Sequence, residues 1–184
     1  RVLLIMSALN RKWGSMRLFS LEGWIHQWEM PEMYAGAGRQ GAEDAWYQTM
    51  IDLELLQLGG TAYCVGTVDI MKFFDQILRP LVYELLRVAG MPEPILDAYG
   101  RFQEGLKVHN SLAGSSGHAY VRTCSIPQGC PLSMMIVAIM MRPWLTMIKQ
   151  MGLQPKVLAD DVLVLSQGKS MLSRLARGLS ATHV

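Results

Sequence analysis

Two adjacent carboxylates, Asp160 and Asp161, lie between the short apolar runs of the sequence LADDVLVLSQG. No other acidic residue occurs between Glu104 and this pair. One interpretation is a polar hairpin turn. The other is a metal site, because hard cations such as Mg²⁺ bind carboxylate oxygens. The isolation of the pair within an acid-free region favours the metal site.

A second acidic position, Asp69, ends the expected strand in VGTVDIMKFFDQI and is followed by an aromatic pair and by Asp75. Asp69 could instead cap a helix that begins after it. Carboxylates from neighbouring strands can meet at one edge of a sheet, and Mg²⁺ is usually held by one or two carboxylates plus substrate phosphates. We therefore expect Asp69 and Asp160 to be metal ligands. Asp161 joins them only if the turn bends the chain, since adjacent strand residues point to opposite faces.

A third motif, Pro127-Gln128-Gly129, joins an expected strand to a long apolar helix in CSIPQGCPLSMM. Glycine at this place would let a backbone or ligand approach closely. The plain alternative is a Pro-Gly turn. Two phosphate-binding patterns elsewhere are incomplete. The sequence GAGRQG lacks a preceding buried strand and a following βαβ unit, and GKS has Leu163 where the first glycine of a phosphate loop should stand.

The elements that must position these motifs follow from hydrophobic periodicity and turn residues. Helices are expected over 13–28, 41–58, 79–90, 92–105 and 131–152, the last apolar almost all round and therefore buried against a sheet. Strands are expected over 61–70, 106–110, 119–124, 155–159 and 162–166. This order predicts an α+β fold with a mainly antiparallel sheet.

Charge is segregated along the chain although the formal net charge is only +2. Residues 1–21 hold four basic residues and no acid, and residues 105–159 hold five basic residues and no acid. An anion-binding groove and a solvated surface both remain open from charge alone. No apolar stretch approaches the roughly 20 residues that span a bilayer, and the start lacks a signal-peptide pattern. An intracellular location, nucleus or cytoplasm if eukaryotic, and three reduced cysteine thiols are expected.

The three ordered motifs resemble the palm of reverse transcriptases, specifically retroelement enzymes of the non-LTR or group II intron type. VDIMKFFD is similar to the first catalytic motif, SIPQGCPLS to the second and LADD to the third, with Leu158 in place of the usual aromatic. RVLLIMSALNRKW looks like a fingers motif, and GAGRQGAEDAW looks like the Gly-rich stretch before the palm. The resemblance extends through most of the chain.

The resemblance implies a right-hand fold, with fingers from residues 1–60 and 80–122, a palm from 61–79 and 123–184, and no thumb in this chain. It also implies roles for individual residues. Phe74 would stack under the incoming sugar on the open side of the sheet, with Phe73 in the core. The implied catalytic metal ligands are Asp69, Asp160 and Asp161; the implied nucleotide-binding residues are Arg1, Ile70, Phe74, Gln128 and Gly129; the implied template and primer contacts are Arg39 and Pro127.

The implied activity is template-directed DNA synthesis from an RNA template, a DNA primer and deoxynucleoside triphosphates. Two Mg²⁺ ions, for which Mn²⁺ can substitute, would serve the nucleotidyl transfer, and no membrane is involved. Two alternatives remain. The first is a catalytically decayed fragment that only binds nucleic acid, which is consistent with a missing thumb. The second is a nucleotide cyclase with a similar palm, which SIPQG followed by a buried helix disfavours.

Overall fold

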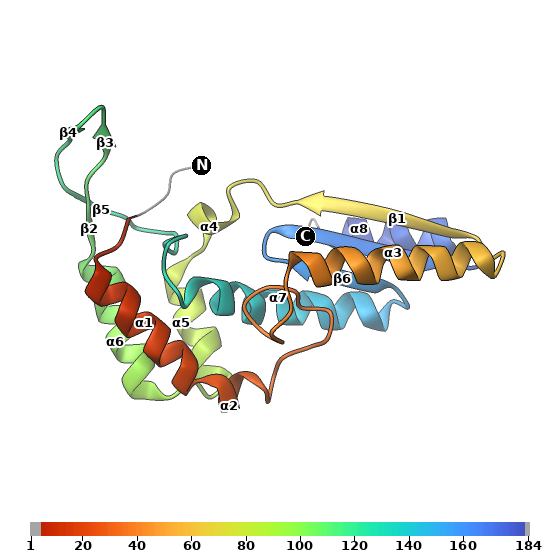
Figure 1. Ribbon diagram of the computed structural model, residues 1–184, viewed down its shortest axis with the longest axis horizontal. Coiled ribbons are helices and arrows are strands. Elements are labelled where there is room, and N and C mark those ends of the chain that lie inside the picture. Colours follow the sequence, from red (N-terminus) through yellow and green to blue (C-terminus); the bar gives the residue numbers. More distant parts are fainter. Residues whose placement is uncertain (1–4, 183–184) are drawn as a thin grey trace. The chain divides into compact units, whose positions relative to one another are not determined.

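The computed structural model describes residues 5–182, which divide into two compact units (Figure 1). The helical unit comprises residues 5–24 and 72–133, and the sheet unit comprises residues 25–71 and 134–182. The helices are α1 Ala8–Ser20, α2 Glu22–Ile25, α3 Ala42–Leu58, α4 Phe73–Gln76, α5 Arg79–Val88, α6 Glu93–Gly105, α7 Ser133–Gln150 and α8 Met171–Thr182. The strands are β1 Tyr63–Asp69, β2 Lys107–Val108, β3 Ser111–Leu112, β4 Ser115–Ser116, β5 Tyr120–Val121, β6 Gln154–Leu158 and β7 Asp161–Gln167.

The sheet unit is built on a three-stranded antiparallel sheet in the order β1-β7-β6. Helix α8 packs against β1 and β7 and covers one face of the sheet. Gly66 in β1 is part of this contact, because a Cβ at this position would lie 3.3 Å from Leu175 and 3.4 Å from Leu179 of α8. Successive strand residues alternate between faces, so Val65, Thr67 and Asp69 point away from α8.

Helix α7 supplies much of the core of the sheet unit, as its apolar sequence predicts. Five consecutive residues from Met135 to Ile139 are at most 2% exposed. The glycine-rich turn before α3 packs close to the start of this helix. Gly36 has φ of 75°, and a Cβ there would overlap the backbone carbonyl of Met134. The first glycine of GAGRQG is therefore required by packing and backbone conformation, which explains the pattern without a bound phosphate.

The helical unit packs α5 against α6 around buried aliphatic and aromatic side chains. Its core includes Val82, Leu86, Leu96 and Tyr99, none more than 2% exposed. The expected hairpin is present, with β2 paired to β5, and the turn-rich segment between them adds a second pair, β3 with β4. The fold class predicted from the sequence, α+β with an antiparallel sheet, is confirmed.

The prediction of one continuous helix over 13–28 is wrong. Helix α1 ends at Ser20, and the short α2 follows after Leu21, which is completely buried. The Ser20 hydroxyl donates to the Arg17 carbonyl at 2.8 Å, a local side-chain hydrogen bond that competes with the helical ladder. Met16, expected on the buried face, is 60% exposed.

The two compact units differ in their bounds from the expected fingers and palm. Residues 25–60 lie in the sheet unit, whereas residues 72–79 lie in the helical unit. The assignment of fingers and palm to residue ranges stays a prediction. Within residues 5–182, no helix is both long and apolar enough to cross a membrane.

Candidate active site

Asp69 and Asp161 are directly opposed residues of the sheet unit. Asp69 is the last residue of β1, Asp161 is the first residue of β7, and the antiparallel register pairs them. Directly opposed residues in an antiparallel pair place their side chains on the same face, with Cβ atoms about 4.5–5.5 Å apart. Both residues are exposed. The sheet thus holds two carboxylates side by side on the face that α8 leaves uncovered.

Asp160 lies in the two-residue turn between β6 and β7, next to Ala159. The backbone N–H of Ile70 donates to the carbonyl of Asp160 at 3.2 Å, which fixes this turn beside the end of β1. Ala159 has φ of 57°, a left-handed conformation that favours glycine and costs about 1–3 kcal/mol in other residues. Backbone strain of this kind gathers at functional sites, where the surrounding structure enforces it.

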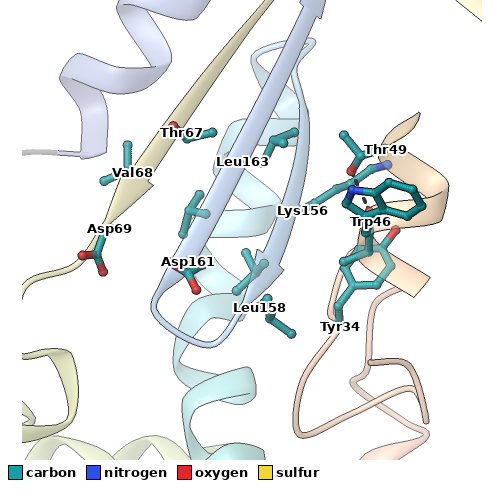
Figure 2. Close-up of a pocket in the computed structure, with 13 residues that line it drawn as sticks. Tyr34, Trp46, Thr49, Thr67, Val68, Asp69, Lys156, Leu158, Asp161 and Leu163 are labelled. Atoms are coloured by element: carbon teal, nitrogen blue, oxygen red, sulfur yellow. Dashed lines mark hydrogen bonds between the residues drawn. The ribbon is translucent and has the colours of Figure 1, made fainter. Parts of the chain in front are cut away.

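Beside these carboxylates, the structure contains a cavity of about 380 Å³ that lies wholly within the sheet unit (Figure 2). Strand residues on the Asp69 face form one wall, and Tyr34 and residues of α3, including Trp46 and Thr49, form another. Helix α3 is fixed to this face by an ion pair, since the ammonium of Lys156 in β6 lies 2.6 Å from the carboxylate of Asp52. The carboxylates therefore stand at the margin of a largely apolar hollow.

Tyr34, 5% exposed, contributes a neutral phenol to this cavity. Burial, and after it the negative charges of Asp52, Glu32 and Asp44, raises the pKa of Tyr34. The tyrosine therefore stays protonated at neutral pH and can donate a hydrogen bond.

The donor set suits a hard cation, although it is small. Across residues 5–182, no three Asp, Glu, His or Cys side chains are grouped so that they could hold a metal ion. Two opposed carboxylates nevertheless repel one another unless a cation lies between them. Mg²⁺ commonly keeps several waters and binds through one or two carboxylates plus substrate phosphates. Asp69 and Asp161, with Asp160 in the adjoining turn, fit that pattern.

A second group of candidate residues lies in the helical unit. Pro127, Gln128 and Gly129 follow β5 and precede α7, with Pro127 buried, Gln128 half-buried and Gly129 exposed. Phe74 lies in α4, and its backbone carbonyl accepts a hydrogen bond from the N–H of Ile126 at 3.1 Å. The structure therefore brings the aromatic motif and the Pro-Gln-Gly loop together.

The expected burial of the aromatic pair is reversed. Phe74 is 7% exposed, whereas Phe73, expected in the core, is half-buried. The two rings contact edge to face, with centroids 6.1 Å apart. In the short helix α4 successive side chains point in different directions, so the two rings have different surroundings.

Of the two arginines expected at the site, Arg39 lies within the described residues and Arg1 does not. Arg39 is exposed at the end of the glycine-rich turn of the sheet unit, with φ of 51°. Arg1 lies outside the described residues.

In the fold, acidic side chains from elsewhere neutralise much of the acid-free basic segment, residues 105–159. It contains Lys107, Arg122, Arg142, Lys149 and Lys156. Arg122 pairs with Asp75, Lys149 with Glu32 and Lys156 with Asp52. Acids remote in sequence therefore neutralise three of these five cations. The separation of basic and acidic residues along the sequence thus overestimates the positive charge of the surface.

Sequence reasoning missed the residues that complete the cavity, namely Tyr34, Trp46, Thr49 and Lys156. A partial signal existed, because Trp46 and Tyr47 directly follow the acidic first turn of α3, and both are about 60% exposed. Their position beside the Asp69 face depends on tertiary packing.

Asp69, Asp160 and Asp161 all lie within a segment that matches a known protein family. Residues 22–182 match the family "Reverse transcriptase (RNA-dependent DNA polymerase)". The chain belongs to this family. No curated protein matches it.

One similar solved structure is apo telomerase from Candida tropicalis, truncated from its C-terminal domain. The superposition has a TM-score of 0.59 at 14% identity and covers 94% of this chain. The match covers 36% of the telomerase chain. This likeness supports the fingers and palm fold that the sequence motifs predict.

Proposed function

We propose that this chain is the fingers and palm part of a retroelement-type reverse transcriptase that extends a DNA primer on an RNA template. The observation that carries the proposal is the opposition of Asp69 and Asp161 beside the turn that contains Asp160. These residues lie in VDIMKFFD and LADD, which resemble the first and third catalytic motifs of the family. The retroelement type rests on the sequence motifs VDIMKFFD, SIPQGCPLS and LADD.

In the proposed reaction, the primer 3′-hydroxyl attacks the α-phosphate of a deoxynucleoside triphosphate and pyrophosphate leaves. Asp69 and Asp161, with Asp160 adjacent, would hold Mg²⁺, which when bound supplies charge neutralisation at the reacting phosphates. The remaining work of the protein is positioning, because phosphoryl transfer requires little covalent chemistry from side chains. We assign Gln128, Gly129 and Phe74 to the incoming nucleotide.

Template and primer would contact Arg39, Pro127 and exposed basic side chains such as Arg11 and Lys107. Such contacts hold phosphates without reading sequence and weaken with added salt. Ile70 would present backbone to the nucleotide, as the residue after Asp69. Arg1 would contact the triphosphate of the incoming nucleotide.

A second candidate is a chain that binds nucleic acid without catalysis. It needs only exposed basic side chains such as Arg11 and Lys107, which can bind phosphates whether or not a metal ion is held at the acids. It predicts binding of primed template that is independent of Mg²⁺ and unaffected by loss of Asp69 or Asp161.

The test is primer extension on primed RNA with Mg²⁺ and the four deoxynucleotides, comparing the wild type with Asp69→Asn, Asp161→Asn and Asp97→Asn. Asp97 is a matched control, because it is an acid of α6 that pairs with Arg101 at 3.9 Å on the surface. Any extension should disappear in the two site variants and persist in the control. Extension that survives Asp69→Asn would contradict the proposed active site. Template binding that is independent of Mg²⁺ and unchanged in both site variants, with no detectable extension by the wild type, would favour the second candidate.

A further inference from the structure

The Pro-Gln-Gly loop is attached to α4 by backbone hydrogen bonds on its N-terminal side. The N–H of Ser125 donates to the carbonyl of Ile77 at 2.7 Å, and the N–H of Ile126 donates to that of Phe74 at 3.1 Å. Both donor residues are nearly inaccessible, at 2% and 1% exposed. A displacement of α4 would therefore displace the start of the loop with it.

Side chains make a second attachment between the same two segments. The guanidinium of Arg122 lies 2.5 Å from the carboxylate of Asp75, the acid that follows Phe74. The thiol of Cys124 donates to the Asp75 carbonyl at 3.3 Å. The side chains of Arg122 and Asp75 are 24% and 38% exposed, so water only partly screens the ion pair.

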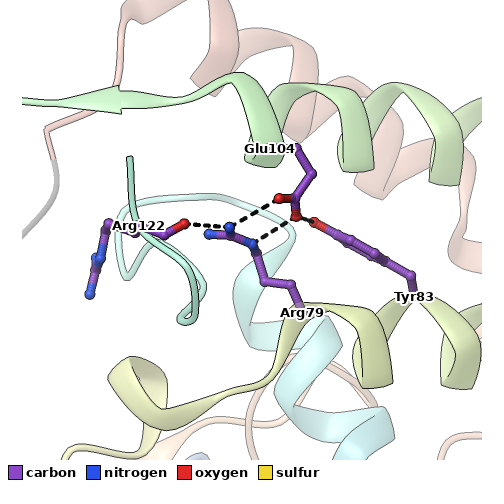
Figure 3. Close-up of polar contacts among 4 residues, drawn as sticks. All are labelled: Arg79, Tyr83, Glu104 and Arg122. Carbon is purple, nitrogen blue, oxygen red and sulfur yellow. Dashed lines mark hydrogen bonds and ion pairs between the residues drawn. The ribbon is translucent and has the colours of Figure 1, made fainter. Parts of the chain in front are cut away.

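Arg122 is also held through its backbone. Its carbonyl accepts a hydrogen bond from the guanidinium of Arg79, which is itself 4% exposed at the start of α5 (Figure 3). Arg79 binds the carboxylate of Glu104 in bidentate fashion, at 2.9 and 3.1 Å, and the Tyr83 hydroxyl donates to the same carboxylate at 2.8 Å. Such a planar fork fixes direction as well as distance.

The C-terminal side of the loop is closed as well. The carbonyl of Pro127 accepts from the Ser133 hydroxyl at 2.6 Å and from the N–H of Cys130 at 3.1 Å. Between these buried ends, Gln128 and Gly129 are accessible. The loop is thus a short exposed tip, attached on one side to α4 through Asp75 and on the other to the first residue of α7.

We propose that Asp75 and Arg122 are positioning residues, which hold the Gln128-Gly129 tip in the orientation that binds an incoming nucleoside triphosphate. This inference rests on the proposed function, because it takes the tip to be a nucleotide contact. Arg79 supports the pair by fixing the backbone of Arg122. Neither Asp75 nor Arg122 need touch the nucleotide.

The experiment titrates the chain with a fluorescent deoxyadenosine triphosphate analogue in the presence of Mg²⁺. The variants are Asp75→Asn, Arg122→Gln and the exchanged pair Asp75→Arg/Arg122→Asp. Arg87→Gln is the control, because it breaks an exposed ion pair with Glu84 on α5 in the same unit. Hydrogen exchange of the Ser125, Ile126 and Cys130 amides is measured on the same proteins.

Each single variant should weaken nucleotide binding roughly tenfold, a usual size for coupling between neighbouring sites. It should also speed exchange of the three loop amides without a matching change in amides of α7. The exchanged pair should recover most of the affinity, a rescue that a purely structural loss would not give. The control should behave as the wild type.

The outcomes separate this inference from the proposed function. A wild type that binds no nucleotide contradicts the proposed nucleotide site. A wild type that binds, together with single variants that bind equally well or keep slow loop exchange, contradicts only the positioning role. Lost affinity that the exchanged pair does not recover would also overturn it, provided urea unfolding shows that pair to be folded.

Discussion

Asp69 and Asp161 face one another across β1 and β7, as directly paired residues at the ends of two antiparallel strands. Asp160, in the turn before Asp161, is joined to β1 by the hydrogen bond from Ile70 to its carbonyl rather than by strand pairing. The two acids of LADD therefore have different structural positions. One is a partner of Asp69 within the sheet, and the other is part of the turn that ends it.

The opposed carboxylates should destabilise the protein in the absence of cations. We expect Asp69→Asn to raise the free energy of unfolding by about 0.5 kcal/mol in chelator, because like charges directly across strands repel. Added Mg²⁺ should stabilise the wild type more than this variant. Thermal unfolding with and without Mg²⁺ measures both effects, and Asp97→Asn is the control. Equal responses to Mg²⁺ in the wild type and in Asp69→Asn would show that no cation binds there.

The left-handed conformation of Ala159 should be relieved by glycine. We expect Ala159→Gly to stabilise the fold by about 1 kcal/mol, since φ of 57° is strained for a residue with a Cβ. Ala176→Gly, at an exposed position in α8, should have the opposite sign and cost about 1 kcal/mol. Urea unfolding compares the two. Destabilisation by both substitutions would mean that the turn at Ala159 is not strained.

Alanine substitutions at Gly36 and Gly60 distinguish the energetic cost of steric overlap from the cost of backbone strain. Both have positive φ, 75° and 62°, so alanine at either costs about 1 kcal/mol in strain. At Gly36 the added Cβ also overlaps the Met134 carbonyl, whereas no described atom lies within 4 Å of that position at Gly60.

Gly36→Ala should therefore cost about 1–3 kcal/mol more than Gly60→Ala, as overpacked substitutions do. The difference in urea midpoint, converted with a common m-value, measures this excess. Equal losses at the two positions would show that the turn does not pack on α7 as described.

Glu104 should make stability depend on acid pH. Burial acts to raise its pKa, but the hydrogen bonds from Arg79 and Tyr83 outweigh it, so the pKa is lowered from 4.5. A carboxyl whose pKa is lower in the folded state stabilises the fold fully above its ordinary pKa. That stabilisation is lost as the pH falls from 4.5 towards the folded-state value.

Glu104→Gln should lower stability at pH 7 and reduce the additional loss seen below pH 4.5. Urea unfolding at a series of pH values measures the slope. A slope below pH 4.5 that is the same in the variant and the wild type would assign acid sensitivity to other carboxylates.

The chain alone should bind primed template but extend it poorly. Binding needs basic side chains such as Arg11, Arg17 and Lys107, and should weaken steeply with salt as phosphate contacts release counterions. Extension needs the primer terminus in line with the α-phosphate, and a misplacement of about 1 Å can cost on the order of a hundredfold in rate.

Filter binding at two salt concentrations beside a primer-extension assay tests both halves of this prediction. Vigorous extension would show that the palm suffices to hold a primer. Absent or salt-insensitive binding would contradict the electrostatic contacts.

The sequence alone determined the elements whose signals are local. The apolar run from Leu132 to Met141 specified a buried helix, and alternation with turn residues specified the β6–β7 hairpin around LADD. Three ordered motifs also sufficed to indicate the reverse transcriptase family. These features depend on neighbours within a few residues, which is the range over which periodicity and turn preference act.

Tertiary structure alone decided the register, the burial of individual side chains and the pairing of charges. Asp161 opposes Asp69 because cross-strand hydrogen bonds align β1 with β7, and a shift of one residue would have placed it on the other face. Phe74 is buried rather than Phe73, in a short helix whose backbone is hydrogen-bonded to a segment about fifty residues later. Lys156 is neutralised by Asp52 from α3, far away in sequence. Each outcome depends on which distant surfaces meet, and local sequence patterns contain no information on that.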